Sequence, residues 1–336
     1  MAVRVGVNGF GRIGRCILRE VVKRDDIEIV GINDIADLNN LAYLFKYDSV
    51  HRRFEGDVKV DGDVLVIDGT KVPFTKIREP EELPWKDLGA DIVFEATGLF
   101  RTRELAAKHL KAGAKKVVVS APFKGGDGDF TVVYGVNHDQ YDASKHDIVS
   151  NASCTTNCFS PVVKVLNETF GIEHGLMTTA HSYTSSQKIL DLPAKDWRRG
   201  RAAALSIIPT TTGAAIATTK VFPELKGKLD AIALRAPVPD GAVVDFVCRV
   251  KKEASVDSVN EAFKKYADGE LKGVLEYAKD QIVSMDILGN PHSSIFDPGF
   301  TKVIDGKLVK VLSWYDNEWG FSMRMIDVAI MLGKSL

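Results

Sequence analysis

The chain has 336 residues, which is enough for two domains of about 150 residues each. Lys and Arg number 44 against 45 Asp and Glu, and 45% of the residues are hydrophobic, which excludes a disordered chain and indicates neither a nucleic-acid nor a membrane partner. The four cysteines are too few for a disulfide scaffold and include no C-x-x-C pair, so we expect no metal site and a reducing, cytoplasmic location.

Short β-rich runs alternate with helical patterns over the first 150 residues. We expect strands at 3–7, 27–32, 91–95, 117–120 and 131–134, and helices over about 13–21 and 102–112. The first of these strands begins almost at once, so a signal peptide is not expected. The alternation is typical of βαβ units, and it predicts an α/β domain with a mostly parallel sheet.

The pattern changes near residue 150. We expect a long polar loop over 181–201, strands at 231–235, 242–250 and 307–314, and an apolar helix over about 321–332. The uncharged stretch 202–219 contains threonines, a proline and a glycine, which excludes a membrane span there. The second part is therefore predicted to be an α+β domain whose sheet is mostly antiparallel.

Three glycines follow the first strand and open the first helix, in the pattern Gly9-x-Gly11-x-x-Gly14. The first permits a tight turn, the second a close approach to a diphosphate, and the third tight packing of helix on strand. Asp34 ends the second strand, where its carboxylate would bind ribose hydroxyls and repel a 2′-phosphate. The pattern predicts a Rossmann-type domain that binds NAD rather than NADP. A plain glycine turn and an FAD site are the alternatives.

Cys154 stands among small hydroxyl residues just before an apolar helical pattern. At a helix N-terminus the dipole would lower the pKa of its thiol and favour a reactive thiolate. Pro161 disagrees with a regular helix, so the helix either starts later or is kinked there. Cys158 would face the same way and could compete as a nucleophile. The alternative is that both cysteines are small buried side chains.

A histidine and several arginines follow this cysteine. Beside Cys154, His181 would act as the base that forms the thiolate and then as an acid, whereas the alternative is a structural or surface histidine. Arg199 lies in a basic loop and Arg235 ends a later strand, and guanidinium groups suit phosphate oxygens. A solvated basic loop and arginines paired across a subunit interface are the alternatives.

Six motifs give the whole chain a close resemblance to the phosphorylating glyceraldehyde-3-phosphate dehydrogenase family. They are Asn8-Gly-Phe-Gly-Arg-Ile-Gly14, Lys46-Tyr-Asp-Ser49, Ala152-Ser-Cys-Thr-Thr-Asn157, His181-Ser-Tyr-Thr184, Ile208-Pro-Thr-Thr-Thr-Gly213 and Trp314-Tyr-Asp-Asn-Glu-Trp-Gly320. The resemblance implies a Rossmann-type NAD-binding domain over 1–152, completed by a C-terminal helix at 318–336, and a catalytic domain over 153–317. It also implies a homotetramer.

The resemblance further implies a role for each site residue. Cys154 would be the nucleophile and His181 its base. NAD would be bound by Gly9, Gly11, Arg12, Ile13, Gly14, Asp34, Arg78, Thr97, Ser120 and Asn317, the last of which would orient the nicotinamide carboxamide. The substrate phosphate and the inorganic phosphate would be bound by Ser153, Thr155, Thr184, Arg199, Thr212, Gly213 and Arg235.

The implied reaction is the oxidation of D-glyceraldehyde 3-phosphate, with NAD and inorganic phosphate, to 1,3-bisphosphoglycerate through a hemithioacetal and a thioester of Cys154. The nearest rival is an erythrose-4-phosphate dehydrogenase, which resolves the thioester with water. That branch usually lacks the equivalents of Tyr183 and Thr184, and both are present here. A non-enzymatic binding protein on the same scaffold agrees poorly with the intact Cys154, His181 and Arg235.

Overall fold

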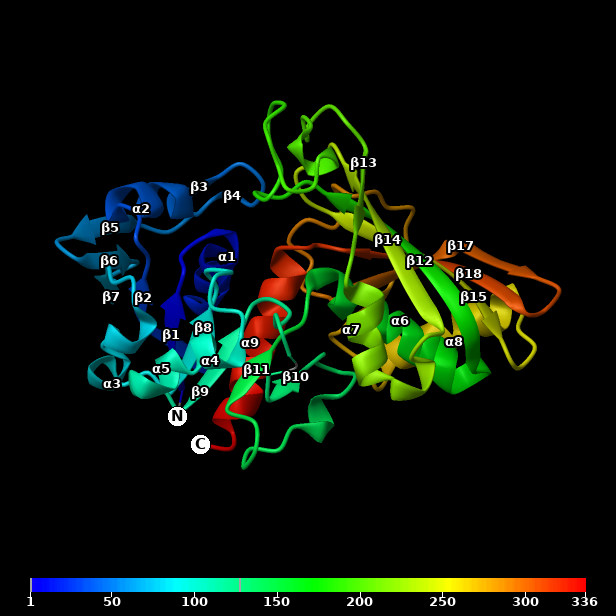
Figure 1. The fold of residues 1–336 in the computed structure, drawn as a ribbon, viewed down its shortest axis with the longest axis horizontal. Coiled ribbons are helices and arrows are strands. Elements are labelled where there is room, and N and C mark those ends of the chain that lie inside the picture. Colours follow the sequence, from blue (N-terminus) through cyan, green and yellow to red (C-terminus); the bar gives the residue numbers. More distant parts are fainter. Residues whose placement is uncertain (1, 127) are drawn as a thin grey trace. The chain divides into compact units, whose positions relative to one another are not determined.

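The computed structural model describes residues 2–126 and 128–336 of the chain (Figure 1). These residues form two compact units, each with its own sheet. The first unit comprises Met1–Tyr134, His138–Ala152 and Ser322–Leu336, and the second comprises Gly135–Asn137 and Ser153–Phe321. Within the described ranges, none of the helices has the length and the apolar run that crossing a bilayer requires.

A nine-stranded sheet forms the centre of the first unit, in the order β10-β11-β9-β8-β1-β2-β7-β6-β5. Its strands are β1 (Val3–Asn8), β2 (Ile27–Asn33), β5 (Val58–Asp61), β6 (Val64–Ile67), β7 (Thr70–Thr75), β8 (Ile92–Glu95), β9 (Lys116–Val119), β10 (Phe130–Thr131) and β11 (Ile148–Ser150). All pairs from β10 to β7 are parallel, and β6 and β5 are added antiparallel. The fully buried central strands β8 and β9 explain the continuous apolar runs in the sequence.

Short helices and one small ribbon surround this sheet. They are α1 (Arg12–Val21), α2 (Leu38–Lys46), α3 (Trp85–Leu88), α4 (Arg103–Ala106), α5 (Lys108–Lys111), most of α9 (Trp319–Gly333), the 3₁₀ turns η1 (Pro80–Glu82) and η2 (His138–Gln140), and the ribbon β3 (Tyr47–Asp48) and β4 (Arg52–Arg53). The expected helical stretch over 102–112 is present as two short helices, since Ala107 lies between α4 and α5 with ψ of −15°, a tighter turn than that of an α-helix. The expected strand over 131–134 ends early, since a turn begins at Tyr134.

The second unit contains a seven-stranded sheet in the order β13-β14-β12-β15-β18-β17-β16. The strands are β12 (Ile172–Ser182), β13 (Ile208–Thr211), β14 (Leu229–Ala236), β15 (Ala242–Val250), β16 (Leu275–Tyr277), β17 (Ser294–Ile304) and β18 (Leu308–Tyr315). Pairs β12–β14 and β16–β17 are parallel and the other pairs are antiparallel. The predicted fold class, a Rossmann-type domain with a mostly antiparallel α+β domain, is confirmed.

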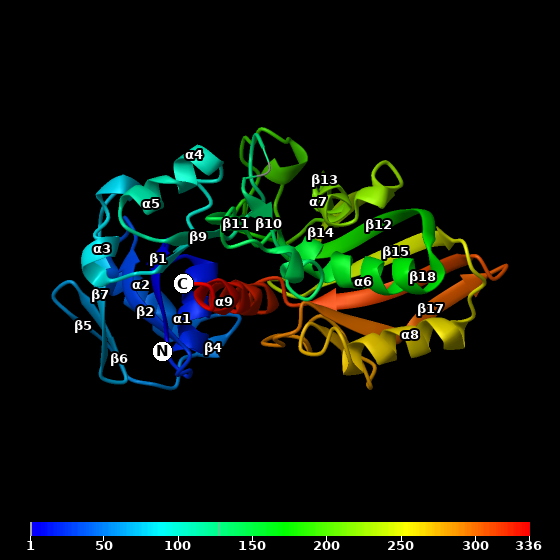
Figure 2. The same ribbon diagram turned by 90° about the horizontal axis from the view of Figure 1, so that it is seen from below.

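Helices cover one face of this second sheet. They are α6 (Cys154–Phe170), α7 (Ala214–Val221) and α8 (Val256–Asp268), and the short turns η3 (Arg198–Gly200) and η4 (Pro223–Leu225) lie in the connections. Helices α6 and α8 contact each other and strand β17, and Figure 2 shows them side by side along the sheet. This packing holds the first residue of α6 at one end of the strands.

Candidate active site

The glycine turn between β1 and α1 lies at the carboxyl edge of the first sheet. Gly9 has φ of +99°, and a Cβ there would lie 2.6 Å from the backbone nitrogen of Thr97, so only glycine fits. A Cβ at Gly14 would overlap the Gly9 carbonyl oxygen, whereas a Cβ at Gly11 would meet open space. Among the described residues, no side chain caps α1 at Gly11, and the positive end of the helix dipole there suits a diphosphate.

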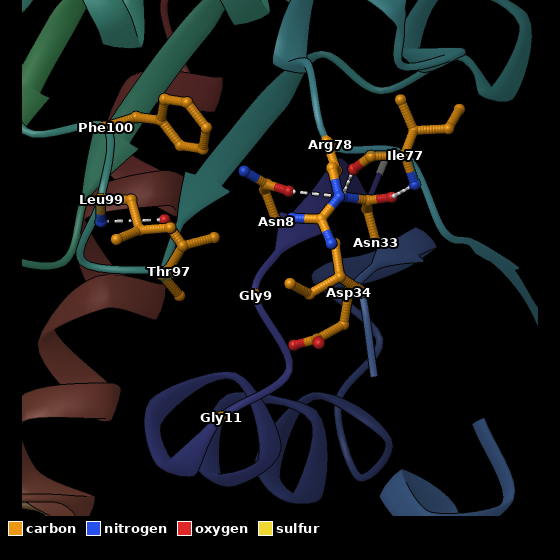
Figure 3. A pocket seen from close by; sticks show the side chains of 12 residues that line it. Asn8, Gly9, Gly11, Asn33, Asp34, Ile77, Arg78, Thr97, Leu99 and Phe100 are labelled. Atoms are coloured by element: carbon orange, nitrogen blue, oxygen red, sulfur yellow. Dashed lines mark hydrogen bonds between the residues drawn. The ribbon is translucent and has the colours of Figure 1, made fainter. Parts of the chain in front are cut away.

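A pocket of about 290 Å³ opens beside this turn (Figure 3). Asp34 follows β2 and lines the pocket. One of its carboxylate oxygens accepts a hydrogen bond from the Phe10 N–H at 2.8 Å, and the other accepts one from the Ala36 N–H at 2.9 Å. These bonds fix the carboxylate and leave lone pairs for the ribose hydroxyls of a nucleotide. Of the predicted cofactor residues, the pocket is lined by Gly9, Gly11, Asp34, Arg78 and Thr97.

The remaining predicted cofactor residues do not line this pocket. Arg12, Ile13 and Gly14 form the first turn of α1. Ser120 follows β9 and donates its N–H to the carbonyl oxygen of Glu95 at 2.9 Å, and Asn317 belongs to the second unit. Sequence reasoning missed several pocket residues, namely Asn8, Asn33, Ile35, Ile77, Ala96, Leu99 and Phe100. Their shared signal is a position at or just beyond a strand end.

Helix α6 begins at Cys154 itself and continues through Pro161, so the expectation of a later start is wrong. Ser153 caps the helix by accepting the N–H of Thr156 at 3.1 Å. Proline costs a hydrogen bond in a helix interior. Every residue from Thr155 to Leu166 is buried, so tertiary packing outweighs that cost.

The sulfur of Cys154 lies 3.4 Å from Nε2 of His181, within one unit. Cys154 is partly buried, and His181, the penultimate residue of strand β12, is almost fully buried. Nδ1 of His181 lies 2.8 Å from the carbonyl oxygen of Ser182. Each tautomer of His181 has a partner here. With the proton on Nδ1, the ring donates to that carbonyl and directs the Nε2 lone pair at the thiol, whereas with the proton on Nε2, Nδ1 accepts from the guanidinium of Arg235 at 2.7 Å.

Burial dominates the protonation of this pair. Desolvation raises the pKa of Cys154 to about 11, although the positive charge of Arg235 opposes it. Desolvation, with Arg235 as the second cause, lowers the pKa of His181 to about 3. The expected lowering of the Cys154 pKa at the helix N-terminus is therefore wrong, because desolvation is the larger effect. The pair is a thiol beside a neutral imidazole, whose Nε2 is able to accept the thiol proton when the ring proton lies on Nδ1.

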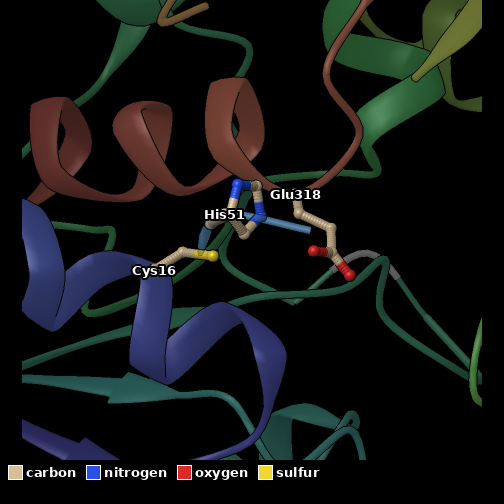
Figure 4. Close-up of side chains that lie close together, drawn as sticks. All are labelled: Cys16, His51 and Glu318. Atoms are coloured by element: carbon tan, nitrogen blue, oxygen red, sulfur yellow. The ribbon is translucent and has the colours of Figure 1, made fainter. Parts of the chain in front are cut away.

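The other cysteines are less suited to nucleophilic attack. Cys158 is fully buried, with its sulfur 3.6 Å from the Ser294 hydroxyl oxygen, and burial raises its pKa to about 12. It does not compete with Cys154. In the first unit, the sulfur of Cys16 on α1 lies within 4.8 Å of a ring nitrogen of His51 (Figure 4). Two such groups are fewer than the four ligands of a structural zinc site.

Strand register brings Arg235 to His181. Strands β12 and β14 are parallel, and His181 is paired with Arg235 along them. Nη1 of Arg235 lies 2.7 Å from Nδ1 of His181 and 2.9 Å from the Ser182 carbonyl oxygen. Among the described residues its Nε is buried without a hydrogen-bond partner. A guanidinium with an unused donor beside the reactive pair suits an anionic substrate group.

The other predicted anion-binding residues have local hydrogen-bond partners or lie at the starts of helices. Arg199 donates to the Thr210 hydroxyl at 2.8 Å and lies 3.6 Å from Asp196, so local partners hold its side chain. Thr184 shares a hydrogen bond with Ser186 at 2.9 Å. The remaining four lie at helix starts. Ser153 caps α6 and Thr155 is its second residue, the Thr212 hydroxyl accepts the Ala214 N–H, and Gly213 precedes α7.

Two residues near Cys154 and His181, namely Tyr315 and Ser182, were not predicted as site residues from the sequence. The hydroxyl of buried Tyr315 lies 2.9 Å from those of Thr155 and Thr179, and its ring meets that of His181 edge-on. The Ser182 hydroxyl donates to Oδ1 of Asn317 at 2.8 Å, and the Gly241 N–H does so at 3.2 Å. With Oδ1 occupied, Asn317 offers its Nδ2 as a donor. The signal for both was their place inside recognised motifs.

Comparisons with known proteins agree along the whole chain. Residues 3–103 match the family profile described as glyceraldehyde 3-phosphate dehydrogenase, NAD binding domain, and residues 153–317 match that of the C-terminal domain of the same enzyme. A glyceraldehyde-3-phosphate dehydrogenase of Geobacillus stearothermophilus is 57% identical over 334 residues, 99% of either chain. Those of Priestia megaterium and Streptomyces coelicolor are 54% and 53% identical, over 98% and 100% of either chain.

Proposed function

The chain belongs to the glyceraldehyde-3-phosphate dehydrogenase family of NAD-dependent oxidoreductases, and we propose that it oxidises D-glyceraldehyde 3-phosphate, with NAD and inorganic phosphate, to 1,3-bisphosphoglycerate. The observation that supports this most is the group formed by Cys154, His181 and Arg235, with 3.4 Å between sulfur and Nε2 and 2.7 Å between Nδ1 and the guanidinium. It combines a nucleophile, a base and an anion-binding cation in one place.

The first step is addition of Cys154 to the aldehyde carbon. His181, in the tautomer whose ring proton lies on Nδ1, takes the thiol proton at Nε2 as the sulfur–carbon bond forms, because the pair starts as thiol and neutral imidazole. The resulting imidazolium then stabilises the oxyanion of the hemithioacetal, together with backbone N–H groups at the start of α6. Burial strengthens this electrostatic stabilisation, since water screens it less.

The second step converts the hemithioacetal into a thioester. NAD supplies the hydride acceptor when bound. The oxyanion collapses to a carbonyl as the hydride leaves its carbon, so the acyl group stays attached to Cys154. An oxygen of inorganic phosphate then attacks the thioester carbon, and the carbon–sulfur bond breaks. Cys154 leaves as the thiolate and recovers its proton from His181.

Two anion sites follow from this chemistry. Arg235, with its buried unpartnered Nε, is proposed to bind the substrate phosphate, together with Thr184. Arg199 is proposed to lie between the two anions, exchanging Asp196 and Thr210 for phosphate oxygens. The attacking phosphate is assigned to the hydroxyl and backbone groups at the starts of α6 and α7, namely Ser153, Thr155, Thr212 and Gly213.

The cofactor residues keep the roles that the resemblance implies. The turn from Gly9 to Gly14, with Arg12 and Ile13, is proposed to hold the diphosphate, and Asp34 the adenosine ribose. Arg78, Thr97 and Ser120 are proposed to border the cofactor, the first two from the pocket. Asn317 is proposed to donate from Nδ2 to the carboxamide oxygen, because its own oxygen already accepts two hydrogen bonds.

Quaternary structure, location and domain limits are also proposals. The second sheet exposes apolar side chains on the face that the helices do not cover, and we propose that this face joins copies in a homotetramer.

The small number of cysteines and the absence of a disulfide scaffold support a cytoplasmic location. We further propose that residues 318–336 complete an NAD-binding domain formed by 1–152, with 153–317 as the catalytic domain.

The decisive experiment is NAD reduction followed by absorbance, with glyceraldehyde 3-phosphate as substrate, in the presence and absence of inorganic phosphate. The proposal predicts fast turnover with phosphate and little without it. Turnover that does not depend on phosphate would instead assign hydrolysis of the thioester, as in an erythrose-4-phosphate dehydrogenase. A folded, reduced protein that turns over neither with NAD nor with NADP would contradict an enzymatic function.

A further inference from the structure

A series of buried polar side chains joins the ends of three neighbouring strands beneath the pocket of Figure 3. Asn8, Asn33 and Glu95 are the last residues of β1, β2 and β8, and strand register pairs Asn8 with both of the others. Asn33 Nδ2 donates to Asn8 Oδ1 at 2.8 Å, and Asn8 Nδ2 donates to Glu95 Oε2 at 2.7 Å. All three side chains are at least 96% buried.

The direction of these hydrogen bonds is fixed at the Asn33 end. The backbone N–H of Ile77 donates to Asn33 Oδ1 and the Ile77 carbonyl accepts from Nδ2, both at 2.9 Å. Backbone groups cannot exchange these roles, so Asn33 has one amide orientation. Its Nδ2 must therefore meet the oxygen of Asn8, and the Asn8 amide nitrogen must face Glu95.

The direction is fixed independently at the opposite end. The indole N–H of Trp85 donates to Nδ1 of His109 at 3.0 Å, and an indole nitrogen is only ever a donor. The proton of neutral His109 must then lie on Nε2, which is 2.9 Å from Glu95 Oε2. Both residues are fully buried. Oε2 of Glu95 therefore accepts two hydrogen bonds, one from Asn8 Nδ2 and one from His109 Nε2.

The other carboxylate oxygen of Glu95 accepts from Thr97. The Thr97 backbone N–H lies 2.9 Å from Oε1, and the Thr97 hydroxyl donates to the same atom. The hydroxyl in turn accepts the N–H of Leu99 at 3.0 Å, which fixes its direction. Glu95 therefore accepts four hydrogen bonds. A buried carboxylate needs such donors to offset the loss of hydration.

We propose that Glu95 is a positioning residue for the dinucleotide. Glu95 accepts hydrogen bonds from Asn8, which precedes the Gly9 turn, and from Thr97. A Cβ at Gly9 would lie 2.6 Å from the backbone nitrogen of Thr97, so the two turns are in contact. Glu95 itself does not line the pocket, whereas Asn8, Gly9 and Thr97 do. Its carboxylate holds both turns at one separation before the cofactor binds, which reduces the ordering cost of binding. The inference depends on the proposed cofactor site.

Two substitutions outside the pocket test this role. Glu95→Gln places an amide NH₂ against donors whichever way it is turned, so two hydrogen bonds are lost. His109→Phe keeps an aromatic ring against Phe100 but removes the donor to Glu95 and the acceptor for Trp85. Each is expected to raise the Kd for NAD, measured by titration calorimetry, about tenfold or more. His109→Gln offers both a donor and an acceptor and should recover much of the affinity.

A matched control is available in the same unit. Asp129 has a side chain only 7% exposed and accepts the N–H groups of Asp147 and Ile148 at 3.0 and 2.9 Å, away from the pocket residues. In Asp129→Asn the amide oxygen can still accept these two N–H groups, but the bond from Arg103 to the other oxygen is lost. The variant should lower the Tm but leave the Kd for NAD unchanged. In steady-state kinetics, Glu95→Gln and His109→Phe should raise the KM for NAD while the KM for the phosphorylated aldehyde stays constant.

The outcomes separate this inference from the proposed function. Wild-type protein that binds no NAD would refute the cofactor site itself. If wild type binds NAD and folded Glu95→Gln and His109→Phe bind it with the wild-type Kd, the positioning role is refuted. A Kd raised equally in Asp129→Asn would also refute it, because the effect would then follow from lost stability. If Glu95→Gln does not fold, the comparison of His109→Phe with His109→Gln decides.

Discussion

At the scale of single residues, two effects oppose each other at Cys154. Arg235 favours the thiolate and burial favours the thiol, and burial is the larger effect. The same burial keeps His181 neutral, so the base is ready to accept a proton. The position of the acceptor, 3.4 Å from the sulfur, therefore matters more than a thiolate formed in advance.

Replacing the nucleophile tests this assignment. Cys154→Ser should reduce kcat by at least about 10³-fold, because a hydroxyl is a far weaker nucleophile than a thiol and cannot form the thioester. Binding of NAD, measured by calorimetry, should persist. Cys158→Ser is the matched control, since the buried Cys158 takes no part in the reaction and its site already holds hydroxyl groups. A Cys154→Ser variant with substantial turnover would contradict the mechanism.

Asp240 gives a pH-dependent prediction. Burial, and then the negative charges of Asp316 and Glu318, raises its pKa to about 9. Between its ordinary pKa and this value the folded state binds more protons than the unfolded state, so this group makes stability fall as pH rises through that interval. Asp240→Asn should remove the effect. It should raise the Tm by about 2 °C or more at about pH 8.5, and by less at about pH 5.5. An equal gain at both pH values would refute the assignment.

At the scale of elements, packing and capping decide where helices form. Helix α6 continues through Pro161 because its surroundings are buried, whereas the 102–112 segment divides at Ala107 despite a helical pattern. Helix α8 shows the local contribution separately. Ser255 accepts the Ser258 N–H at 3.1 Å, and the Ser258 hydroxyl accepts the Ser255 N–H at 2.9 Å.

Removing this cap should weaken the second unit without affecting chemistry. Ser255→Ala is expected to lower the free energy of unfolding by about 1 kcal/mol, because the N–H of Ser258 in the first turn of α8 loses its side-chain partner. Thermal and denaturant unfolding at one fixed protein concentration would measure this. Glu261→Ala, at an exposed position within α8, serves as the control and should change stability by less than about 0.5 kcal/mol. A change in kcat for Ser255→Ala would be unexpected.

At the scale of the whole molecule, the second sheet has two unlike faces. Helices α6 and α8 pack on one face, while Leu176 on β12 is 69% exposed and Ile232 on β14 is 53% exposed. A contiguous exposed apolar patch indicates an interaction surface more than single exposed side chains do, and these two side chains lie on neighbouring strands. They support the proposed homotetramer, in which a copy of the chain covers them.

The proposed assembly has a direct test. Light scattering of the wild type at micromolar concentration should give a mass near four copies of the 36.8 kDa chain. The double variant Leu176→Glu/Ile232→Glu should give a smaller species, because burying two unpaired carboxylates at an interface is costly. Val256→Glu, 40% exposed at the start of α8, should leave the mass unchanged. A wild-type mass of one chain would refute the tetramer.

Local spacing alone determined the dinucleotide fingerprint, the change of architecture near residue 150 and the candidate nucleophile. Each of these features depends on neighbours within about one helix or strand, such as Gly9, Gly14 and Ser153. Chain order along the motifs then indicated the family, and the sheets confirmed the predicted fold class.

Only the tertiary structure decided which distant groups meet. His181 meets Arg235 through the register of β12 and β14, and Glu95 receives donors from Asn8 and His109, 87 and 14 residues away in sequence. The shifted pKa values of Cys154 and His181 arise from desolvation, which depends on everything packed around them. Sequence spacing carries no information on register between distant strands or on burial of a single atom, so these features required the folded chain.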